Sequence, residues 1–368
     1  MIIELKSKEG IYLKGKVAVA MSGGVDSSLT AALLIEQGYD VIGVTMNLSD
    51  ESREKGGSTA ITDAKKVADA LNIPHYVVNY HKQFNDEVIK YFISEYAHGR
   101  TPNPCVRCNN AIKFGGLLQD CLALGAEYVA TGHYARIEQD EKMGRYVIKK
   151  GVDERKDQSY MLYTLDKDIL KYFMLPLGVY SKDKTRELAN SMNLPVANKP
   201  ESQEICFIPN DDYKAYLKQK APHILKPGDI VDVDGNYLGK HEGVPLYTIG
   251  QRKGLGIAAL HPLYVVGLDV KRNRVIVGEN KDVFAYGLVA QNLNFITRDE
   301  FNKPFTTTAK IRYGAKECEC EISPLNDGKL AKVIFKEPQR AITPGQSIVF
   351  YDKEIVVGGG TIKNIIRK

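Results

Sequence analysis

The first 131 residues alternate short apolar runs with longer amphipathic segments. The apolar runs have the length of buried strands and span residues 16–21, 40–46, 73–79 and 127–131. The amphipathic segments predict helices after Ser28 and at 62–71, 83–97 and 111–124. This alternation predicts an α/β fold, in which helices cover both faces of a parallel sheet.

The pattern changes after about residue 215, where Pro, Gly and short alternating runs replace the helical segments. Runs such as LYVVGLDV and NRVIVGE indicate short antiparallel strands joined by turns. From about residue 286 further short runs, such as KECECEI and SIVFYD, continue this strand-like pattern. We therefore expect three domains: residues 1–215, a small β-rich domain at 216–285, and a C-terminal β-barrel at 286–368.

Composition places the 368-residue chain among ordinary globular proteins, with 43% hydrophobic and 26% charged residues. It excludes a disordered tail, a collagen-like fibre and a disulfide-stapled miniprotein. No apolar run approaches the roughly 18 residues that a membrane-spanning helix needs. The N-terminus, MIIELKSKEG, has neither the apolar stretch of a secretion signal nor the arginines of a transit peptide. We therefore expect a cytoplasmic protein without a membrane partner.

The net charge of +5 is concentrated in the C-terminal part of the chain. Residues 211–368 hold 24 Lys and Arg against 18 Asp and Glu, a net of 24 − 18 = +6, whereas residues 1–210 have 26 − 27 = −1. Such an excess indicates a polyanionic partner on that side. Scattered solvated charges are the alternative interpretation, because the excess is modest.

A glycine-rich loop, Ser22–Ser28, lies between the first predicted strand and the first predicted helix. That position turns backbone N–H groups and the positive end of the helix toward an anion, and Gly23 and Gly24 permit close approach. No Gly-Lys-Ser/Thr follows, so this is not the Walker loop of enzymes that act on the γ-phosphate. SGGVDS resembles the pyrophosphate-binding loop of ATP pyrophosphatases, which cleave ATP between the α- and β-phosphates. The resemblance implies that Asp26 lies at the Mg²⁺-pyrophosphate end of the site.

Six cysteines lie at positions 105, 108, 121, 206, 318 and 320. In a reducing compartment, close pairs indicate metal or redox chemistry before structural disulfides. Cys105 and Cys108 lie in TPNPCVRCN, whose two prolines predict an extended, stiff loop around 99–110. A lone CxxC is compatible with zinc, a redox disulfide or a cluster, and no second CxxC supports structural zinc. Cys206, taken alone, is most simply a buried structural thiol.

Seven motifs occur in order along the chain. They are SGGVDSS at 22–28, TPNPCVRCN at 101–109, TGHYAR at 131–136, KDQSYMLY at 156–163, ESQEICFIP at 201–209, YTIGQRKGLGI at 247–257 and TPGQSIVFY at 343–351. Together they resemble the tRNA-specific 2-thiouridylases, PP-loop enzymes that convert the wobble uridine of certain tRNAs to 2-thiouridine. The resemblance covers residues 16–362 and implies a Rossmann-like N-terminal sheet of the PP-loop type.

The resemblance also implies binding residues. Those implied for ATP, bound with Mg²⁺, are Ala20, Met21, Ser22, Gly23, Gly24, Val25, Asp26, Ser27, Met46 and Gly132. They fall at the carboxyl edge of the predicted sheet, where such folds bind ligands. Those implied for tRNA are Asn103, Pro104 and Cys105 at the target base, and His133, Lys156, Asp157, Gln158, Arg312, Tyr313 and Gln346 elsewhere.

Sulfur chemistry is implied by the same resemblance. Cys108 is the implied nucleophile and Cys206 the implied carrier of a persulfide, delivered by a sulfur donor such as a cysteine desulfurase or a sulfur-relay protein. Cys105 departs from the family pattern, because some members have there an aspartate proposed as a general acid/base. Cys105 takes over proton transfer only if its pKa is lowered. The three thiolates are alternatively a ligand set for a [4Fe–4S] cluster with one iron open to hydrosulfide. Both interpretations stay open.

These features predict an enzyme, a tRNA-uridine 2-sulfurtransferase. The uridine O2 would attack the α-phosphate of ATP, and sulfur would then displace AMP at C2. One alternative is a small-molecule, amide-forming ATP pyrophosphatase, which would need no cysteine pair. Another is a non-enzymatic iron–sulfur RNA-binding protein, which would need no SGGVDS loop.

Overall fold

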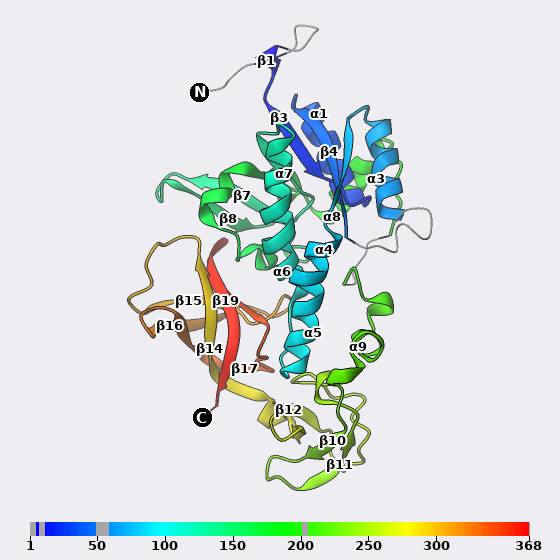
Figure 1. The fold of residues 1–368 in the computed structure, drawn as a ribbon. Coiled ribbons are helices and arrows are strands. Elements are labelled where there is room, and N and C mark those ends of the chain that lie inside the picture. Colours follow the sequence, from blue (N-terminus) through cyan, green and yellow to red (C-terminus); the bar gives the residue numbers. More distant parts are fainter. Residues whose placement is uncertain (1–4, 7–11, 49–58, 201–204, 368) are drawn as a thin grey trace. The chain divides into compact units, whose positions relative to one another are not determined.

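The computed structural model describes residues 5–6, 12–48, 59–200 and 205–367. The chain forms two compact units (Figure 1). The first unit comprises residues 1–87, 106–203 and 354–356, and the second comprises 88–105, 204–353 and 357–368. Most of the polar segment 49–60 lies outside the described residues, as does the beginning of the ESQEICFIP motif.

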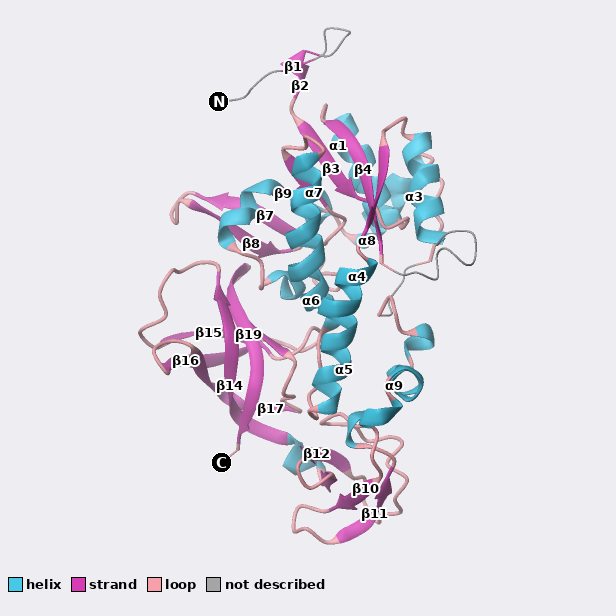
Figure 2. Ribbon diagram, in the orientation of Figure 1, coloured by secondary structure: helices cyan, strands magenta, loops and turns pink. Residues whose placement is uncertain are grey.

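The central sheet of the first unit has five strands, all paired in parallel (Figure 2). Its order is β5-β4-β3-β6-β9, with bounds His75–Asn79, Asp40–Asn47, Lys16–Ala20, Tyr128–Ala130 and Phe173–Met174. The first four are the strands that the apolar runs predict. The edge strand β9 is an addition that the sequence pattern does not indicate.

Helices cover this sheet because their apolar faces continue its core. Val17 and Val19 of β3 share a buried cluster with Leu34 of α1 (Val25–Glu36) and Val67 of α3 (Thr59–Ala70). Burying each such side chain contributes on the order of 2 kcal/mol. Helix α7 (Leu117–Ala123) packs beside β6, and α8 (Lys182–Ser191) packs beside α1. The predicted α/β class is confirmed.

Between residues 81 and 116 the chain is more helical than its sequence predicts. The helix predicted at 83–97 consists of α4 (His81–Phe84), the π-helical turn η1 (Asn85–Ile89) and α5 (Lys90–Ala97). The extended loop predicted around 99–110 is wrong from Pro104 onward. There α6 (Pro104–Cys108) begins and continues into the π-helix η2 (Asn109–Gly116). A proline is tolerated at the first helical position, because its missing N–H has no partner to lose there.

The remaining elements of the first unit are short. An antiparallel hairpin, β7 (Ala135–Asp140) and β8 (Arg145–Lys150), follows β6, and Lys149 of β8 also pairs with Ile355. The 3₁₀ turns are η3 (Ser159–Leu162), η4 (Lys167–Tyr172) and η5 (Pro176–Val179). Near the N-terminus, β1 (Leu5–Lys6) pairs with β2 (Tyr12–Leu13).

The second unit contains α5, α9 (Tyr213–Lys220) and two β structures. One is a four-stranded sheet of order β11-β10-β13-β12, with bounds Tyr237–His241, Gly228–Val231, Arg274–Gly278 and Tyr264–Asp269. The 3₁₀ turns η6 (Pro209–Asp211) and η7 (Pro222–Ile224) lie on either side of α9 in the sequence. The turn η8 (Val244–Leu246) lies between β11 and β12, and η9 (Asn280–Val283) follows β13. The short antiparallel strands expected after residue 215 are present, although β10 pairs in parallel with β13.

The other β structure is a closed six-stranded barrel. Its strands are β14 (Phe284–Phe295), β15 (Phe305–Lys310), β16 (Cys318–Leu325), β17 (Leu330–Arg340), β18 (Ser347–Asp352) and β19 (Ile355–Ile366). The order β14-β17-β16-β15-β18-β19 closes because β14 also pairs with β19. Ile322, Val333 and Phe350 fill its interior. The predicted C-terminal barrel is confirmed.

Candidate functional site

The glycine-rich loop runs directly from β3 into α1. Gly24 has an extended backbone (φ −102°, ψ 169°) and precedes Val25, so Asp26, Ser27 and Ser28 form the first helical turn. The helix therefore starts earlier than the sequence predicts. Gly24 has no side chain that could cap this end, which leaves N–H groups of the first turn available to an anion.

Serine hydroxyls hold the loop in its turn. The Ser27 Oγ accepts a hydrogen bond from the Ser22 N–H at 3.1 Å, and the Ser28 Oγ donates to the Gly24 carbonyl at 2.8 Å. Gly23 has φ +70°, and a Cβ there would lie 2.4 Å from the Ala60 carbonyl oxygen. Only glycine fits this position, because any side chain would meet the Ala60 carbonyl and the backbone has a positive φ.

The residues predicted for ATP gather at one sheet edge. Ala20 ends β3, Met46 lies near the end of β4, and Gly132 follows β6; these are neighbouring parallel strands. A Cβ at Gly132 would lie 2.9 Å from the Ser27 backbone nitrogen, so the end of β6 lies directly against the first turn of α1. Carboxyl edges of parallel sheets bind ligands at such points.

Asp26 lies in a charge-balanced group that includes a lysine with no sequence signal. The Lys182 Nζ donates to both Asp26 carboxylate oxygens, at 2.6 and 2.9 Å, and the Tyr134 hydroxyl donates to Asp26 Oδ1 at 2.8 Å. The Lys182 side chain is only 6% exposed and its Nζ lies 5.4 Å from the centre of the Tyr134 ring. The Lys182 N–H donates to Asp153, and this bond lowers the pKa of the Asp153 carboxyl. The geometry places a buried cation beside the phosphate-binding turn.

A second lysine reaches the same loop. The Lys199 Nζ donates to the Gly23 carbonyl at 2.9 Å and to Asp63 Oδ2 at 2.8 Å. The hydrogen bond from Lys199 lowers the pKa of the Asp63 carboxyl. Sequence reasoning missed both lysines. Lys182 follows the Ser181 cap of α8 and Lys199 lies in a turn, and neither position carries a motif.

His133 is half-buried just after Gly132, and its Nδ1 lies 2.7 Å from the Thr131 Oγ1. Burial lowers the pKa of His133 to about 3, and the nearby Lys113 contributes in the same direction. The imidazole is therefore neutral at physiological pH. A neutral ring can hydrogen-bond to RNA, but it supplies no positive charge.

Lys156, Asp157 and Gln158 lie in the connection between β8 and η3, and each makes a hydrogen bond within the chain. The buried Asp157 carboxylate accepts from Gly151 N at 3.0 Å and from the Ser159 hydroxyl at 2.9 Å. The Gln158 Oε1 accepts from the Tyr134 N–H at 3.1 Å. Asp157 and Gln158 thus shape the backbone beside Tyr134, and their contact with tRNA stays a prediction.

The three implied sulfur-site cysteines differ in exposure. Cys105 and Cys206 are exposed and belong to the second unit, whereas Cys108 is buried, at 7% exposure, and belongs to the first. Cys105 and Cys108 lie on α6, one helical turn apart in sequence, and not on the extended loop that the prolines predict. The interpretation of Cys206 as a buried thiol is wrong, because its turn is open to solvent.

The segment that precedes Cys105 is fixed by the barrel. The Gln346 Nε2 donates to the carbonyl oxygens of Thr101 and Pro102, both at 3.1 Å, and the Thr101 N–H donates to the Pro344 carbonyl at 2.9 Å. The Gln346 amide, predicted to contact tRNA, is thus engaged with the loop that carries Asn103 and Pro104.

Aromatic packing fixes the turn that holds Cys206. Phe207 contacts Phe92 of α5, with ring centres 5.3 Å apart, and Tyr216 of α9, with centres 5.5 Å apart. Buried Ile208 belongs to the same cluster. The backbone next to Cys206 is therefore held by this packing, although Cys206 itself is exposed.

Arg312 and Tyr313 lie in the connection between β15 and β16. Both are exposed, and Tyr313 has 40% of its surface accessible. The Arg312 Nη1 donates to the Arg340 carbonyl at 3.3 Å. An exposed arginine beside an exposed aromatic ring suits contacts with RNA phosphate and bases.

Neither a metal-ligand group nor a membrane-spanning helix occurs in the described ranges of the chain. No group of three His, Cys, Asp or Glu side chains in those ranges is arranged to hold a metal ion. Over the same ranges, no helix has both the length and the apolar character required to cross a membrane.

Three sequence families match successive parts of the chain. The family described as tRNA methyl transferase HUP domain matches residues 15–210. The family described as tRNA methyl transferase PRC-barrel domain matches 214–279, and the one described as aminomethyltransferase beta-barrel domain matches 285–362.

Full-length relatives are more informative. The chain is 54% identical over 363 residues to tRNA-specific 2-thiouridylase MnmA 1 of Caldanaerobacter subterraneus subsp. tengcongensis, covering 96% of this chain and 100% of the relative. It is 51% identical over 356 residues to tRNA-specific 2-thiouridylase MnmA of Carboxydothermus hydrogenoformans, covering 95% of this chain and 97% of that one. These relatives support the thiolating activity and not the amide-forming alternative.

Proposed function

The chain belongs to the family of tRNA-specific 2-thiouridylases, sulfurtransferases that act on tRNA, and we propose that it activates the wobble uridine with ATP and thiolates it with sulfur carried on Cys206. The observation that supports this best is the glycine-rich turn at the N-terminus of α1, with Lys182 and Lys199 bonded to its residues.

Activation is needed because the uridine C2 carbonyl is part of a urea-like system and is a poor electrophile. The uridine O2 attacks the α-phosphate of ATP, pyrophosphate leaves, and the resulting adenylate places AMP as a leaving group on C2. The α1 N-terminus and the serine hydroxyls receive the pyrophosphate, and Mg²⁺ bound with ATP supplies further charge neutralisation. Because Lys182 already balances Asp26, the loop holds a carboxylate next to phosphate without net repulsion.

Sulfur transfer follows at C2. The terminal sulfur of a Cys206 persulfide, loaded by an external sulfur donor protein, attacks C2 and AMP leaves. The Cys108 thiolate then attacks the Cys206 sulfur, which breaks the bond to the transferred sulfur and leaves a Cys108–Cys206 disulfide. A cellular thiol reductant returns the two cysteines to their reduced form. The exposure of Cys206 supports its loading by a protein donor.

The [4Fe–4S] alternative needs three converging thiolates. Cys105 and Cys206 belong to the second unit and Cys108 to the first. The proposal follows the persulfide route, and the iron content of protein prepared without oxygen separates it from the cluster alternative.

We propose that the three domains expected from the sequence, 1–215, 216–285 and 286–368, divide the work between ATP chemistry and tRNA binding. Asn103, Pro104 and Cys105 would face the target base, which must leave the anticodon stack to react. His133, Lys156, Arg312 and Tyr313 would contact the surrounding tRNA. We place this activity in the cytoplasm, where tRNA is available.

The test is a reaction of the purified chain with ATP, a persulfide donor and a transcribed tRNA that carries a wobble uridine. We expect AMP to form only when this tRNA is present, and 2-thiouridine to appear in a mercury-containing gel. A tRNA with cytidine at the wobble position is the matched control. AMP release that is equal with both tRNAs would exclude the proposed substrate.

A further inference from the structure

Residues 251–263, which we name the Arg252 loop, form a long segment of the second unit without helix or strand. Its start is firmly held. The Gln251 N–H donates to the Thr248 carbonyl at 3.0 Å, and the Gln251 carbonyl accepts from Val265 N at 2.9 Å. The Gln251 side chain accepts from Thr248 N at 3.2 Å and donates to the Lys253 carbonyl at 3.0 Å. Long irregular loops that are held in this way are commonly functional.

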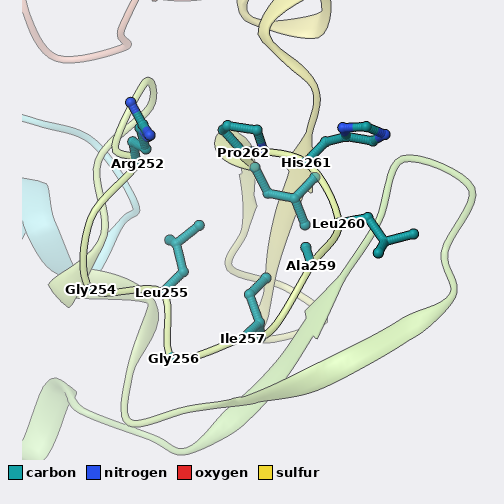
Figure 3. Close-up of a pocket in the computed structure, with 10 residues that line it drawn as sticks. Arg252, Gly254, Leu255, Gly256, Ile257, Ala259, Leu260, His261 and Pro262 are labelled. Atoms are coloured by element: carbon teal, nitrogen blue, oxygen red, sulfur yellow. The ribbon is translucent and has the colours of Figure 1, made fainter.

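The middle of the Arg252 loop is anchored and surrounds a hollow. Leu255 is buried in the core of the four-stranded sheet, with Ile257 and Leu263 packed against the same cluster. The open hollow between these anchors has a volume of about 440 Å³. Figure 3 shows Arg252 at one side of it and His261 at the other.

The cations and backbone amides of the Arg252 loop make no ion pair or donated hydrogen bond to other described residues. Arg252 and Lys253 are exposed, and within the described ranges neither pairs with a carboxylate. The chain has no Asp or Glu from Gly243 to Leu268. Over residues 252–263, no backbone N–H donates a hydrogen bond to another described group of the protein. Unpartnered amides together with free cations form a site for an anion.

An apolar surface adjoins these donors. Leu260 is 98% exposed, the highest value among the large hydrophobic residues described, and it lies next to exposed His261 and Pro262. A site that combines cations, free amides and an apolar or ring surface matches one nucleotide of RNA, in which a phosphate adjoins a flat base.

We propose that the Arg252 loop binds a nucleotide of the tRNA substrate, with the phosphate on Arg252 and Lys253 and the base or ribose against Leu260 and Pro262. This inference rests on the proposed function, since it takes tRNA as the ligand. RNA is favoured over a protein partner because the loop carries only positive charge and lies in the half of the chain with a net charge of 24 − 18 = +6.

The test compares two double variants of the full-length enzyme. Arg252→Gln with Lys253→Gln should weaken tRNA binding and lower the slope of log K against log salt by about two, since each phosphate contact contributes about one. The control is Lys271→Gln with Arg272→Gln, which removes two exposed cations from the turn between β12 and β13 of the same unit. The ATP affinity of both variants should equal that of wild type.

Identical tRNA affinity and salt slope in the two variants would overturn the proposal. A photo-crosslinking amino acid at position 260 adds a direct readout, and we expect it to crosslink to tRNA. Crosslinking to a protein, or saturation of the site by free uridine monophosphate as readily as by tRNA, would also overturn it. The proposed function fails separately, if wild-type enzyme does not thiolate tRNA at all.

Discussion

The glycine-rich loop of the first unit and the cysteine-bearing segments of the second unit differ in how exposed their reactive residues are. In the loop, Asp26 is engaged by Lys182 and Tyr134, and the buried residues Ser27 and Ser28 bond within the turn. In the cysteine segments Cys105 and Cys206 are exposed residues, whereas the neighbouring backbone is fixed through Gln346 and Phe207.

This difference follows from the ligands expected at each place. A highly charged small molecule is best received by groups that are oriented and charge-balanced beforehand, because no reorganisation is then needed during reaction. A sulfur carrier must instead meet two macromolecules in turn, a donor protein and a tRNA. Its thiol therefore has to be reachable, and only the supporting backbone is rigid.

The largest effect is expected when the ion pair between Asp26 and Lys182 beside the glycine-rich loop is broken. Lys182→Met leaves Asp26 without its cation, and we expect AMP formation to fall by about 10² or more, as for other lost electrostatic contacts in active sites. The Asp26 carboxylate that is left without a partner is 33% exposed, so we expect the fold to lose only about 1 kcal/mol of stability. A quenched time course of AMP formation measures the loss of activity, and thermal melting measures the loss of stability.

The exposed Lys184→Met on the same helix α8 is the matched control and should be nearly neutral. The double variant Asp26→Asn with Lys182→Met should regain most of the stability but not the activity. If Lys182→Met adenylates tRNA at the wild-type rate, the loop is not the ATP site.

The second prediction concerns Cys105, the exposed thiol near the target-base segment. In the persulfide route Cys105→Ala keeps the Cys206 persulfide, which mass spectrometry detects as one added sulfur atom. Cys105→Asp should be active without iron. A general acid at this position would make Cys105→Ala slower by about 10².

Iron content and thiolation are compared in wild type and both variants, all prepared without oxygen. Cys121→Ala, at a buried position on α7, serves as a cysteine-loss control. Absence of thiolation in every iron-free wild-type preparation would exclude the persulfide route and favour the cluster.

The smallest effect is expected when Gln346 no longer holds the segment that precedes Cys105. Gln346→Ala removes two hydrogen bonds to the Thr101 and Pro102 carbonyls, together worth about 2 kcal/mol. We expect a fall in kcat of about tenfold or less with little change in tRNA Kd, because the lost bonds position the loop. Gln346→Glu should not rescue, since a carboxylate cannot donate to these carbonyls.

Gln339→Ala provides the comparison, because the side chain of this barrel glutamine donates to the nearby Glu337 carbonyl at 3.0 Å. A weaker tRNA Kd with unchanged kcat in Gln346→Ala would instead favour a direct contact between Gln346 and tRNA. That outcome would remove Gln346 from the support of the cysteine segment.

Much of the fold could be read from local pattern. Four apolar runs predict β3, β4, β5 and β6, and alternation predicts the barrel strands, because burial on one face of a strand or helix imposes a short period on the sequence. Local rules failed at Pro104, where two prolines suggest an extended loop but a proline in fact begins α6. They also gave no indication of the short β7–β8 hairpin.

By itself the sequence determined the parallel sheet, the glycine-rich turn that leads into α1, and the family of the chain, since these depend on contiguous residues. Only the tertiary structure decided that Lys182 balances Asp26 across 156 positions, and that Gln346 holds Thr101 across 245. It also decided that Cys206 is exposed while Asp157 is buried. The physical reason is that a hydrogen bond or ion pair needs two atoms within about 3 Å. The local spacing of apolar and polar residues does not indicate which residues, far apart in the sequence, the folded chain brings to that distance.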